Sequence, residues 1–442
     1  MKQEKESTMN KTFGNIFKGD KVIWMVFFFL CIISVVEVYS ASSQLTYKGG
    51  NYIAPVLKHI SILLMGIFFM VVTLNIKCKY FRIALPLMLG VSFVALISVY
   101  IVGQMTNGAH RWVTVMGIQF QPSELAKGTL VLAVAQILSA MQTEKGADRQ
   151  AFRYILTVCM FFIPLIMLEN LSTAALLCLV VFMMMLIGRV PASQLGKLLG
   201  VTALVISGVF AMVMVFGTDR QREKTVSDVD VTQVVAENKK EESAVEKVFH
   251  RFDTWKARID DFIYNKPLKA EDVDLDKDGQ WAHANIAIAS SNITGKGPGN
   301  SEECDFLSQA FSDFIYAIII EEMGIIGAIF VAMLYIILLF RTGRIANRCE
   351  NNFPAFLAMG LALLLVTQAL FNMCVAVGLA PVTGQPLPLI SKGGTSTIIN
   401  CVYIGAILSI SRSAKRREQS EQKPGTAQVM VNDVMQRRIK TA

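Results

Sequence analysis

The stretch FSDFIYAIIIEEMGIIGAIFVAMLYIILLF, residues 311–340, decides the fold class of this chain. Only three of its side chains are charged at neutral pH: Asp313, Glu321 and Glu322. A helix rises about 1.5 Å per residue and needs about 20 apolar residues to cross the hydrocarbon core of a bilayer. The run is long enough for this, so it predicts a membrane-spanning helix.

Nine further apolar runs lie on either side of this stretch. The predicted spans are 22–41, 53–74, 83–102, 122–141, 154–170, 171–188, 198–217, 311–340, 354–376 and 397–411. The fifth and sixth adjoin at ENLS (169–172), which leaves open whether they are two spans or one bent segment. We therefore predict an all-α polytopic membrane protein with about ten transmembrane helices and one long extracytoplasmic loop.

The composition supports this fold class and excludes several others. Hydrophobic residues make up 53% of the 442 residues and charged residues only 17%, against about 25% charged in an ordinary soluble domain. The polar residues are too few for separate soluble domains or a disordered chain. Eight cysteines are too few for a disulfide scaffold. Metal-binding and phosphate-loop motifs such as HExxH, CxxC and GxxxxGK[ST] do not occur.

The distribution of basic residues predicts the orientation. With the N-terminus inside, the inner segments and tails hold 24 Lys and Arg, whereas the short outer loops hold Lys48, Arg111 and Lys392. This asymmetry satisfies the positive-inside rule and explains the net charge of +8 without a nucleic-acid partner. The predicted parts are a cytoplasmic tail (1–21), seven spans (22–217), a large extracytoplasmic loop (218–310), three spans (311–411) and a second cytoplasmic tail (412–442).

The large outer loop differs from the rest of the chain. It carries 13 basic and 19 acidic residues, a net charge of −6, and long loops follow the charge rule weakly. Within it, Asp274, Asp276, Asp278 and Gly279 resemble the start of a calcium-binding loop. That loop needs a bidentate Glu at the position of Asn285. An acidic solvated turn is therefore the preferred interpretation.

A polar cluster lies at the outer end of the fourth span. Pro122 suits the first position of a helix, and Glu124 and Lys127 are three residues apart on one helical face, near Arg111. One interpretation is a structural ion pair that neutralises itself in the membrane. The other is an anion-binding cavity in which Arg111 and Lys127 face a phosphate group, which both side chains bind well.

The second cluster opens the eighth span. We expect Asp313 in the first helical turn, where the helix dipole favours a carboxylate, with Ser312 as the N-cap. The alternative to this structural role is a general base held at the membrane surface. Glu321 and Glu322 lie about two turns deeper, and we expect them to pair with other spans.

The segment APVTGQPLPLISKGGTS, residues 380–396, contains prolines and glycines that break any helix. Non-helical backbone at membrane depth is tolerated only where protein or water covers it. This segment therefore predicts a re-entrant loop that lines a cavity, with an ordinary turn as the alternative.

Taken together, five segments resemble the SEDS family (shape, elongation, division, sporulation), which includes FtsW and RodA, and the resemblance covers roughly residues 20–411. They are GAHRW (108–112), FQPSELAK (120–127), GKGPGN (295–300), SDFIYAIIIEEMGIIG (312–327) and PVTGQPLPLISKGG (381–394). The resemblance implies a fold of ten spans. It also implies a peptidoglycan glycosyltransferase that polymerises lipid II, the undecaprenyl-linked disaccharide–pentapeptide precursor.

The resemblance also assigns roles to single residues. The family's essential Asp matches Asp313, which would be catalytic. Arg111, Glu124 and Lys127 match family motif residues and are substrate-binding candidates. Three further substrate-binding candidates come from the same segments: Trp112, Ser391 and Lys392. One base for the acceptor hydroxyl and positive charge for a departing pyrophosphate are the groups that such a transfer requires.

This chain departs from the family pattern at several positions. Ser308, Gln309 and Phe311 replace a Pro, a Glu and a His before the essential Asp. Asn170 replaces an intramembrane Asp, and Lys392 replaces a Tyr. Such variants are typical of Bacteroidota-like members.

The resemblance implies lipid II, a class B penicillin-binding protein and other divisome membrane proteins as partners. It implies the inner membrane as the location, at the division site if the chain is FtsW-like, which we favour over RodA-like. No metal ligands are assigned, although a divalent cation, Mg²⁺ or Mn²⁺, would suit the reaction. A lipid II flippase and a scaffold for the transpeptidase are the alternatives from other functional classes.

Overall fold

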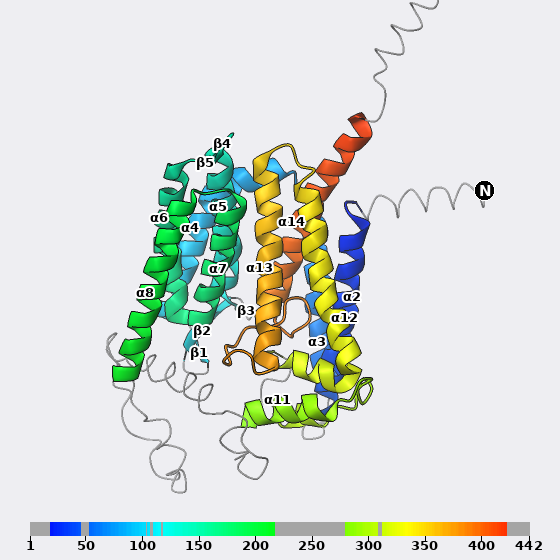
Figure 1. Ribbon diagram of the computed structural model, residues 1–442. Helices are drawn as coiled ribbons and strands as arrows, with labels where there is room; N and C mark the ends of the chain where they lie inside the picture. Colours follow the sequence, from blue (N-terminus) through cyan, green and yellow to red (C-terminus); the bar gives the residue numbers. More distant parts are fainter. Residues whose placement is uncertain are drawn as a thin grey trace, which may run out of the picture.

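The structure is a computed structural model, and it describes residues 18–45, 53–102, 104–106, 109–115, 118–216, 279–307 and 312–421. In this part of the chain, one long helix occupies each predicted span (Figure 1). These helices are α2 (Lys21–Leu45), α3 (Ile53–Asn75), α4 (Cys78–Val102), α5 (Pro122–Ala140), α6 (Arg149–Glu169), α7 (Leu171–Ile187), α8 (Ala192–Phe216), α12 (Ile315–Ala346), α13 (Asn352–Ala376) and α14 (Thr395–Glu421). The predicted all-α polytopic fold is confirmed.

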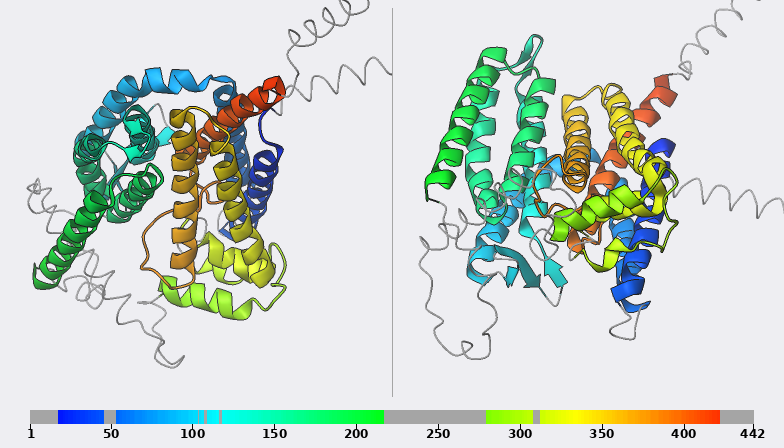
Figure 2. Two further views of the ribbon diagram at one scale, coloured as in Figure 1. Left: turned by 45° about the horizontal axis from the view of Figure 1, so that its top comes forward. Right: turned by 60° about the horizontal axis from the view of Figure 1, so that its bottom comes forward.

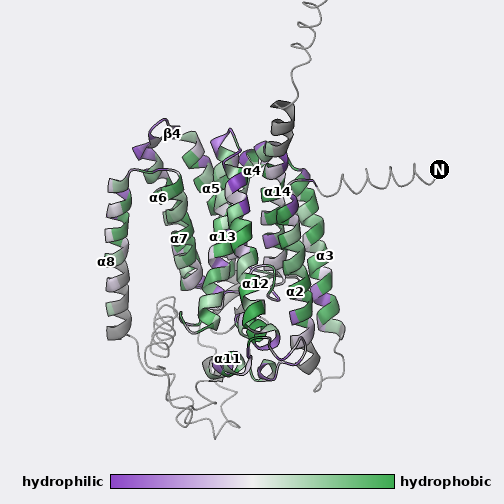
Figure 3. Cartoon of the chain, turned by 45° about the vertical axis from the view of Figure 1, so that its right-hand side comes forward, coloured by the Kyte–Doolittle hydropathy of each residue, from purple (hydrophilic) through white to green (hydrophobic). Residues whose placement is uncertain are grey.

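Eight of the described helices are long and apolar enough to cross a membrane, and α7, with 17 residues, is a shorter apolar helix. Three helices begin five or six residues before the predicted span, at Cys78, Arg149 and Ala192. The early turns carry charged side chains such as Lys79 and Arg153. Apolar runs alone therefore do not mark the beginnings of these helices. Figure 3 shows hydrophobic residues along most of the helix lengths.

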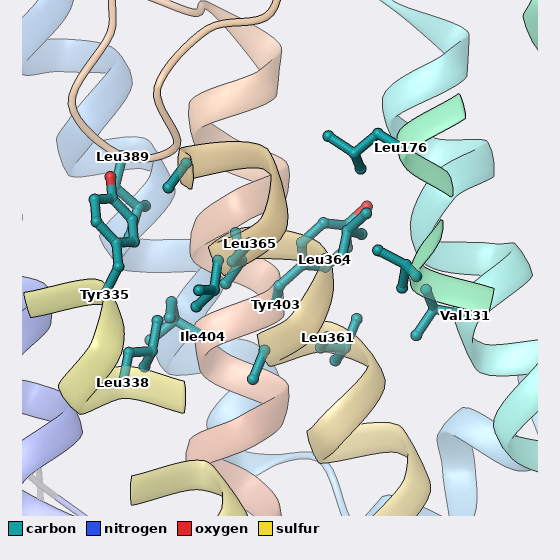
Figure 4. Close-up of a cluster of buried hydrophobic side chains, with 14 of the residues drawn as sticks. Val131, Leu176, Tyr335, Leu338, Leu361, Leu364, Leu365, Leu389, Tyr403 and Ile404 are labelled. Carbon is teal, nitrogen blue, oxygen red and sulfur yellow. The ribbon is translucent and has the colours of Figure 1, made fainter. Parts of the chain in front are cut away.

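Helices α5, α13 and α14 form the centre of the bundle. Between 67% and 72% of their apolar windows is buried, against 28% for α3. Helices α5 and α14 approach closely at Gly128, where an added Cβ would lie 2.5 Å from the Tyr403 hydroxyl. That hydroxyl donates a hydrogen bond of 2.7 Å to the Glu124 carbonyl. Figure 4 shows Tyr403 among the buried apolar side chains, with Leu364 beside it.

Polar contacts join helix termini at one end of the bundle. Asp20 accepts hydrogen bonds from the backbone of the first turn of α2 and from Arg341, near the end of α12. Ser409 donates to the Ile76 carbonyl, which follows α3, and Arg412 donates to Asn75. The start of α2 and the ends of α3, α12 and α14 therefore lie on the same side, as the predicted alternation of spans requires.

Short elements appear where the sequence predicted only loops. Strands β1 (Gln104–Thr106), β2 (Ala109–Val115) and β3 (Ile118–Phe120) form an antiparallel sheet between α4 and α5. Strands β4 (Gln142–Thr143) and β5 (Gly146–Ala147) form a hairpin, and the large loop contains α11 (Gly279–Ser290) and the 3₁₀ turn η1 (Glu303–Asp305). These elements are mostly too short for periodicity to reveal them. Figure 2 shows α11 lying across one end of the bundle.

The fifth and sixth spans are two helices that meet at Asn170. This residue adopts an extended conformation (φ −156°), which ends α6. Its side-chain oxygen accepts hydrogen bonds from the backbone of Ser172 (3.0 Å) and Thr173 (3.3 Å) and so caps α7. Asp and Asn are equally good N-caps. Asn170 therefore keeps the capping function that an Asp would have at this position.

Helix α12 is broken at Gly324, whose φ of 68° and ψ of −172° are not helical. The Tyr316 hydroxyl donates to the Ala328 carbonyl at 3.1 Å. In a continuous helix these residues would be about 18 Å apart along the axis. The break therefore folds the start of α12 back toward the rest of the helix.

We expect Gly324→Ala to destabilise the protein by at least about 2 kcal/mol, because a left-handed residue with a Cβ is strained. The added Cβ would also lie 2.2 Å from the Ile293 carbonyl oxygen. Thermal unfolding of the purified protein in detergent measures this loss. Gly343→Ala is the control, because it lies in the same helix and its Cβ would meet only Met359, at 3.8 Å. Equal melting temperatures for the two variants would contradict the account of the break.

Candidate active site

Asp313 lies in a turn before α12 rather than in its first helical turn. The helix begins at Ile315, and its N-cap is Phe314, without a side-chain capping bond. The expectation that Ser312 caps this helix is therefore wrong: its hydroxyl donates instead to Asp313 Oδ1 at 2.9 Å. Asp313 is 8% exposed. The carboxylate is thus nearly buried and held by its neighbour.

Two hydrogen bonds fix the backbone of this turn. Asn372 on α13 donates from Nδ2 to the Asp313 carbonyl at 2.9 Å. Ser391 in the loop before α14 donates to the Ser312 carbonyl at 2.7 Å. Ser391 also accepts a bond from the Leu387 backbone, and its single proton is already used. The structure gives Ser391 a structural contact, and its predicted contact with substrate stays a prediction.

The segment between α13 and α14 enters the bundle as a non-helical loop. Leu387, Leu389 and Ile390 in it are buried. Ser34 on α2 donates to the Ile390 carbonyl at 2.7 Å, and Tyr335 on α12 donates to the Pro388 carbonyl. Protein therefore covers this irregular backbone, one of the two conditions under which such backbone is tolerated at membrane depth. That the loop lines a cavity stays a prediction.

Glu124 and Lys127 form a buried ion pair on α5. Lys127 Nζ lies 2.8 Å from Glu124 Oε1, and the two side chains are 0% and 3% exposed. Lys127 also donates to Gln368 Oε1 on α13 at 2.8 Å. The predicted shared helical face is confirmed. Complete burial favours the structural interpretation of Lys127 over direct contact with a phosphate.

Helix α13 connects this ion pair with the Asp313 turn. Gln368 donates to the Pro386 carbonyl at 3.0 Å, and Asn372 donates to the Gln385 carbonyl at 2.7 Å. These two amides are four residues apart, one helical turn or about 6 Å along the axis. Lys127 and Asp313 therefore belong to one polar network, formed by α5, α13 and the buried loop.

Gln368 and Asn372 were not among the residues predicted from the sequence. Two amides four residues apart within the apolar run 354–376 were the available signal. Buried side-chain amides need partners, so this spacing indicates a polar helical face. The deeper acids also differ from the expectation in part. Glu322 does accept a bond from Ser40 on another span, but Glu321 contacts Lys296 in the loop between α11 and α12.

The other predicted site residues lie in β2 and in the loop before α14, and one of them is only partly described. Arg111 and Trp112 belong to β2, where Trp112 is half-buried and paired with Gln104, but the Arg111 side chain lies outside the described atoms. Lys392 is half-buried, within electrostatic range of Lys58 on α3. Their substrate contacts stay predictions.

Several further predictions fall outside the described part of the chain. The calcium-like residues up to Asp278 and the departures at Ser308, Gln309 and Phe311 lie there. Gly279 is described, and it begins α11. Within the described residues, no group of three or more metal-ligating side chains occurs.

The comparisons with known proteins place this arrangement in a family. The family model FtsW–RodA–SpoVE, described as "Cell cycle protein", matches residues 20–233 and 248–416. A probable peptidoglycan glycosyltransferase FtsW of Geobacter sp. is 28% identical over 89% of this chain and 96% of its own length. The peptidoglycan glycosyltransferase MrdB of Escherichia coli is 26% identical over 93% and 98%, respectively.

Solved structures agree on the fold. A chain of a peptidoglycan synthase complex, described for its coordination of polymerization and crosslinking, matches with a TM-score of 0.65 at 21% identity. The rod shape determining protein RodA of Thermus thermophilus matches with a TM-score of 0.59 at 21% identity. Each match covers 90% of this chain and 99% of the other. With most of its length matched by the family model, this membrane protein belongs to the FtsW–RodA–SpoVE family.

Proposed function

We propose that the chain is a peptidoglycan glycosyltransferase that polymerises lipid II into β-1,4 glycan strands. The observation that carries this proposal is the polar network that joins the Asp313 turn to Lys127 through Gln368 and Asn372. The network fixes the backbone of the turn before α12 that carries the Asp313 carboxylate, in a chain whose relatives carry this activity in their names.

In the proposed reaction, Asp313 accepts the proton of the acceptor GlcNAc 4-hydroxyl. The oxygen attacks the anomeric carbon of the donor, and the bond from that carbon to the pyrophosphate breaks. The electron pair leaves with undecaprenyl pyrophosphate, and the α-linked donor becomes a β-linked glycan. We assign the stabilisation of the leaving charge to Arg111, because the buried Lys127 is already paired with Glu124.

The structure of the peptidoglycan synthase complex supports a partner that crosslinks the strands, and we propose a class B penicillin-binding protein. We place the protein in the inner membrane with both termini cytoplasmic.

Both FtsW and MrdB relatives match at similar identity. We favour the FtsW-like role, with other divisome proteins as further partners. A fluorescent fusion at mid-cell supports this role, and a lateral pattern contradicts it.

We expect the purified chain with its partner to convert lipid II into glycan strands in detergent, where no transport across a bilayer occurs. Glycan length on a gel measures this activity. A matched vesicle assay measures transbilayer movement of lipid II by the same preparation. Movement without glycan would identify a flippase, and neither activity would favour a scaffold.

A further inference from the structure

The segment 312–323 forms what we call the Asp313 arm: the turn that carries Asp313 and the part of α12 before the break at Gly324. One end of the arm is held by Asn372 and Ser391, as described above. Its middle is packed into the bundle, because Ile315, Ile318 and Ile319 are fully buried. What holds the other end therefore determines the direction of the arm.

At that end, the Glu321 carboxylate is bound on both oxygens by the outer loop. Lys296 Nζ lies 2.8 Å from Oε1, and the Glu302 backbone N–H donates to the same oxygen at 3.1 Å. Ser301 donates to Oε2 at 2.5 Å. Glu321 is fully buried. The carboxylate is therefore satisfied only while this loop is in place.

The backbone of the same loop completes the broken helix. Lys296 N–H donates to the Glu321 carbonyl at 2.9 Å, and Gly297 N–H donates to the Glu322 carbonyl at 2.8 Å. Such carbonyls have no partner within a helix that stops here. A Cβ on Gly295 would lie 2.4 Å from the Gly324 nitrogen. The loop and the arm can therefore approach this closely only because both positions are glycine. Loop and arm therefore fit together at one position.

The two carboxylates that contact Lys296, Glu302 and Glu321, differ in how strongly they hold it. Glu302 is 77% exposed at 3.1 Å, and water screens such a pair. Glu321 is buried, and its hydrogen bond is the main reason that the pKa of Lys296 is raised. Removing Lys296 leaves the buried Glu321 carboxylate without an opposite charge. A buried unpaired charge is strongly unfavourable, so we expect this end of the arm to shift.

We propose that Lys296 and Glu321 are positioning residues, whose ion pair sets the direction of the Asp313 arm and thereby the place of the Asp313 carboxylate. This inference rests on the proposed glycosyl transfer. From Ile315 to Glu321 the arm is roughly 10 Å long, so a tilt of about 6° about its Glu321 end moves the end that carries Asp313 by about 1 Å. A misplacement of about 1 Å can cost about 100-fold in rate.

The test compares Lys296→Met and Glu321→Gln with Glu302→Gln in the full-length protein with its partner. Glu302→Gln removes the exposed partner of the same lysine and is the matched control. We expect both test variants to lower turnover at saturating lipid II by about 10- to 100-fold. The lipid II concentration for half-maximal rate should stay within about twofold, because the arm does not hold the substrate. The control should keep wild-type turnover, and Lys296→Arg should regain most of it.

Melting temperatures of all variants separate positioning from folding. A loss of activity that only follows the loss of folded protein in both test variants would overturn the inference. Unchanged turnover in both would overturn it as well, and if Asp313→Asn is inactive in parallel, the proposed function stands. An active Asp313→Asn protein would instead remove the proposed role of Asp313.

Discussion

Asp313→Asn is expected to abolish glycan synthesis while leaving the protein folded. Asn preserves the size of the side chain and can still accept the 2.9 Å bond from Ser312. It cannot take up a proton from the acceptor hydroxyl. General base catalysis contributes about 100- to 10,000-fold, so the rate should fall by that factor. Gel analysis of glycan strands made from purified lipid II measures the loss.

The control for this variant is lipid II binding together with thermal unfolding. The backbone carbonyl of Asp313, which Asn372 binds, is unchanged in the variant. We therefore expect wild-type melting and lipid II affinity. A loss of binding equal to the loss of rate would mean that Asp313 holds substrate and does not act as the base.

Lys127→Met is expected to cause the largest loss of stability, about 3 to 5 kcal/mol, because it leaves the Glu124 carboxylate buried without a counter-charge. Both side chains are almost completely buried, so water cannot compensate. The variant also removes the bond that holds Gln368. Thermal unfolding in detergent and the yield of monodisperse protein both report this loss.

The double variant Glu124→Gln/Lys127→Met distinguishes the two interpretations of this ion pair. Removing both charges removes the penalty for the unpaired one, so stability should return. We also expect activity to recover to within about tenfold of wild type, because the buried Lys127 acts through structure. Normal melting with persistent inactivity would show that its charge acts on the donor pyrophosphate, as the sequence motif suggests.

The long apolar runs were predictable because membrane helices show a strong, local signal. The pairing of Glu124 with Lys127 was predictable for the same reason, since residues three apart share a face within one helix. The break at Gly324 was not, because a glycine within an apolar run is common in membrane helices. The break depends on contact with Gly295, 29 residues earlier in the chain.

The candidate site was predictable in its charged members and not in its connections. Asp313 and Lys127 stand out because charges within spans are costly. Their link through Gln368 and Asn372 depends on how α13 packs against α5 and the buried loop. Likewise, the sequence placed Glu321 toward other spans, whereas its partner Lys296 comes from a loop whose net charge is negative, like that of Glu321 itself. Partners distant in sequence follow only from the three-dimensional packing.

The most direct test of the central claim is the polymerisation of purified lipid II by this chain with its partner, with wild type and Asp313→Asn in the same experiment. We predict glycan strands from the wild-type complex, with one undecaprenyl pyrophosphate released for each bond formed. We predict no strands from Asp313→Asn or from the partner alone. Strands of equal yield from Asp313→Asn, or none from a folded wild-type complex, would contradict it.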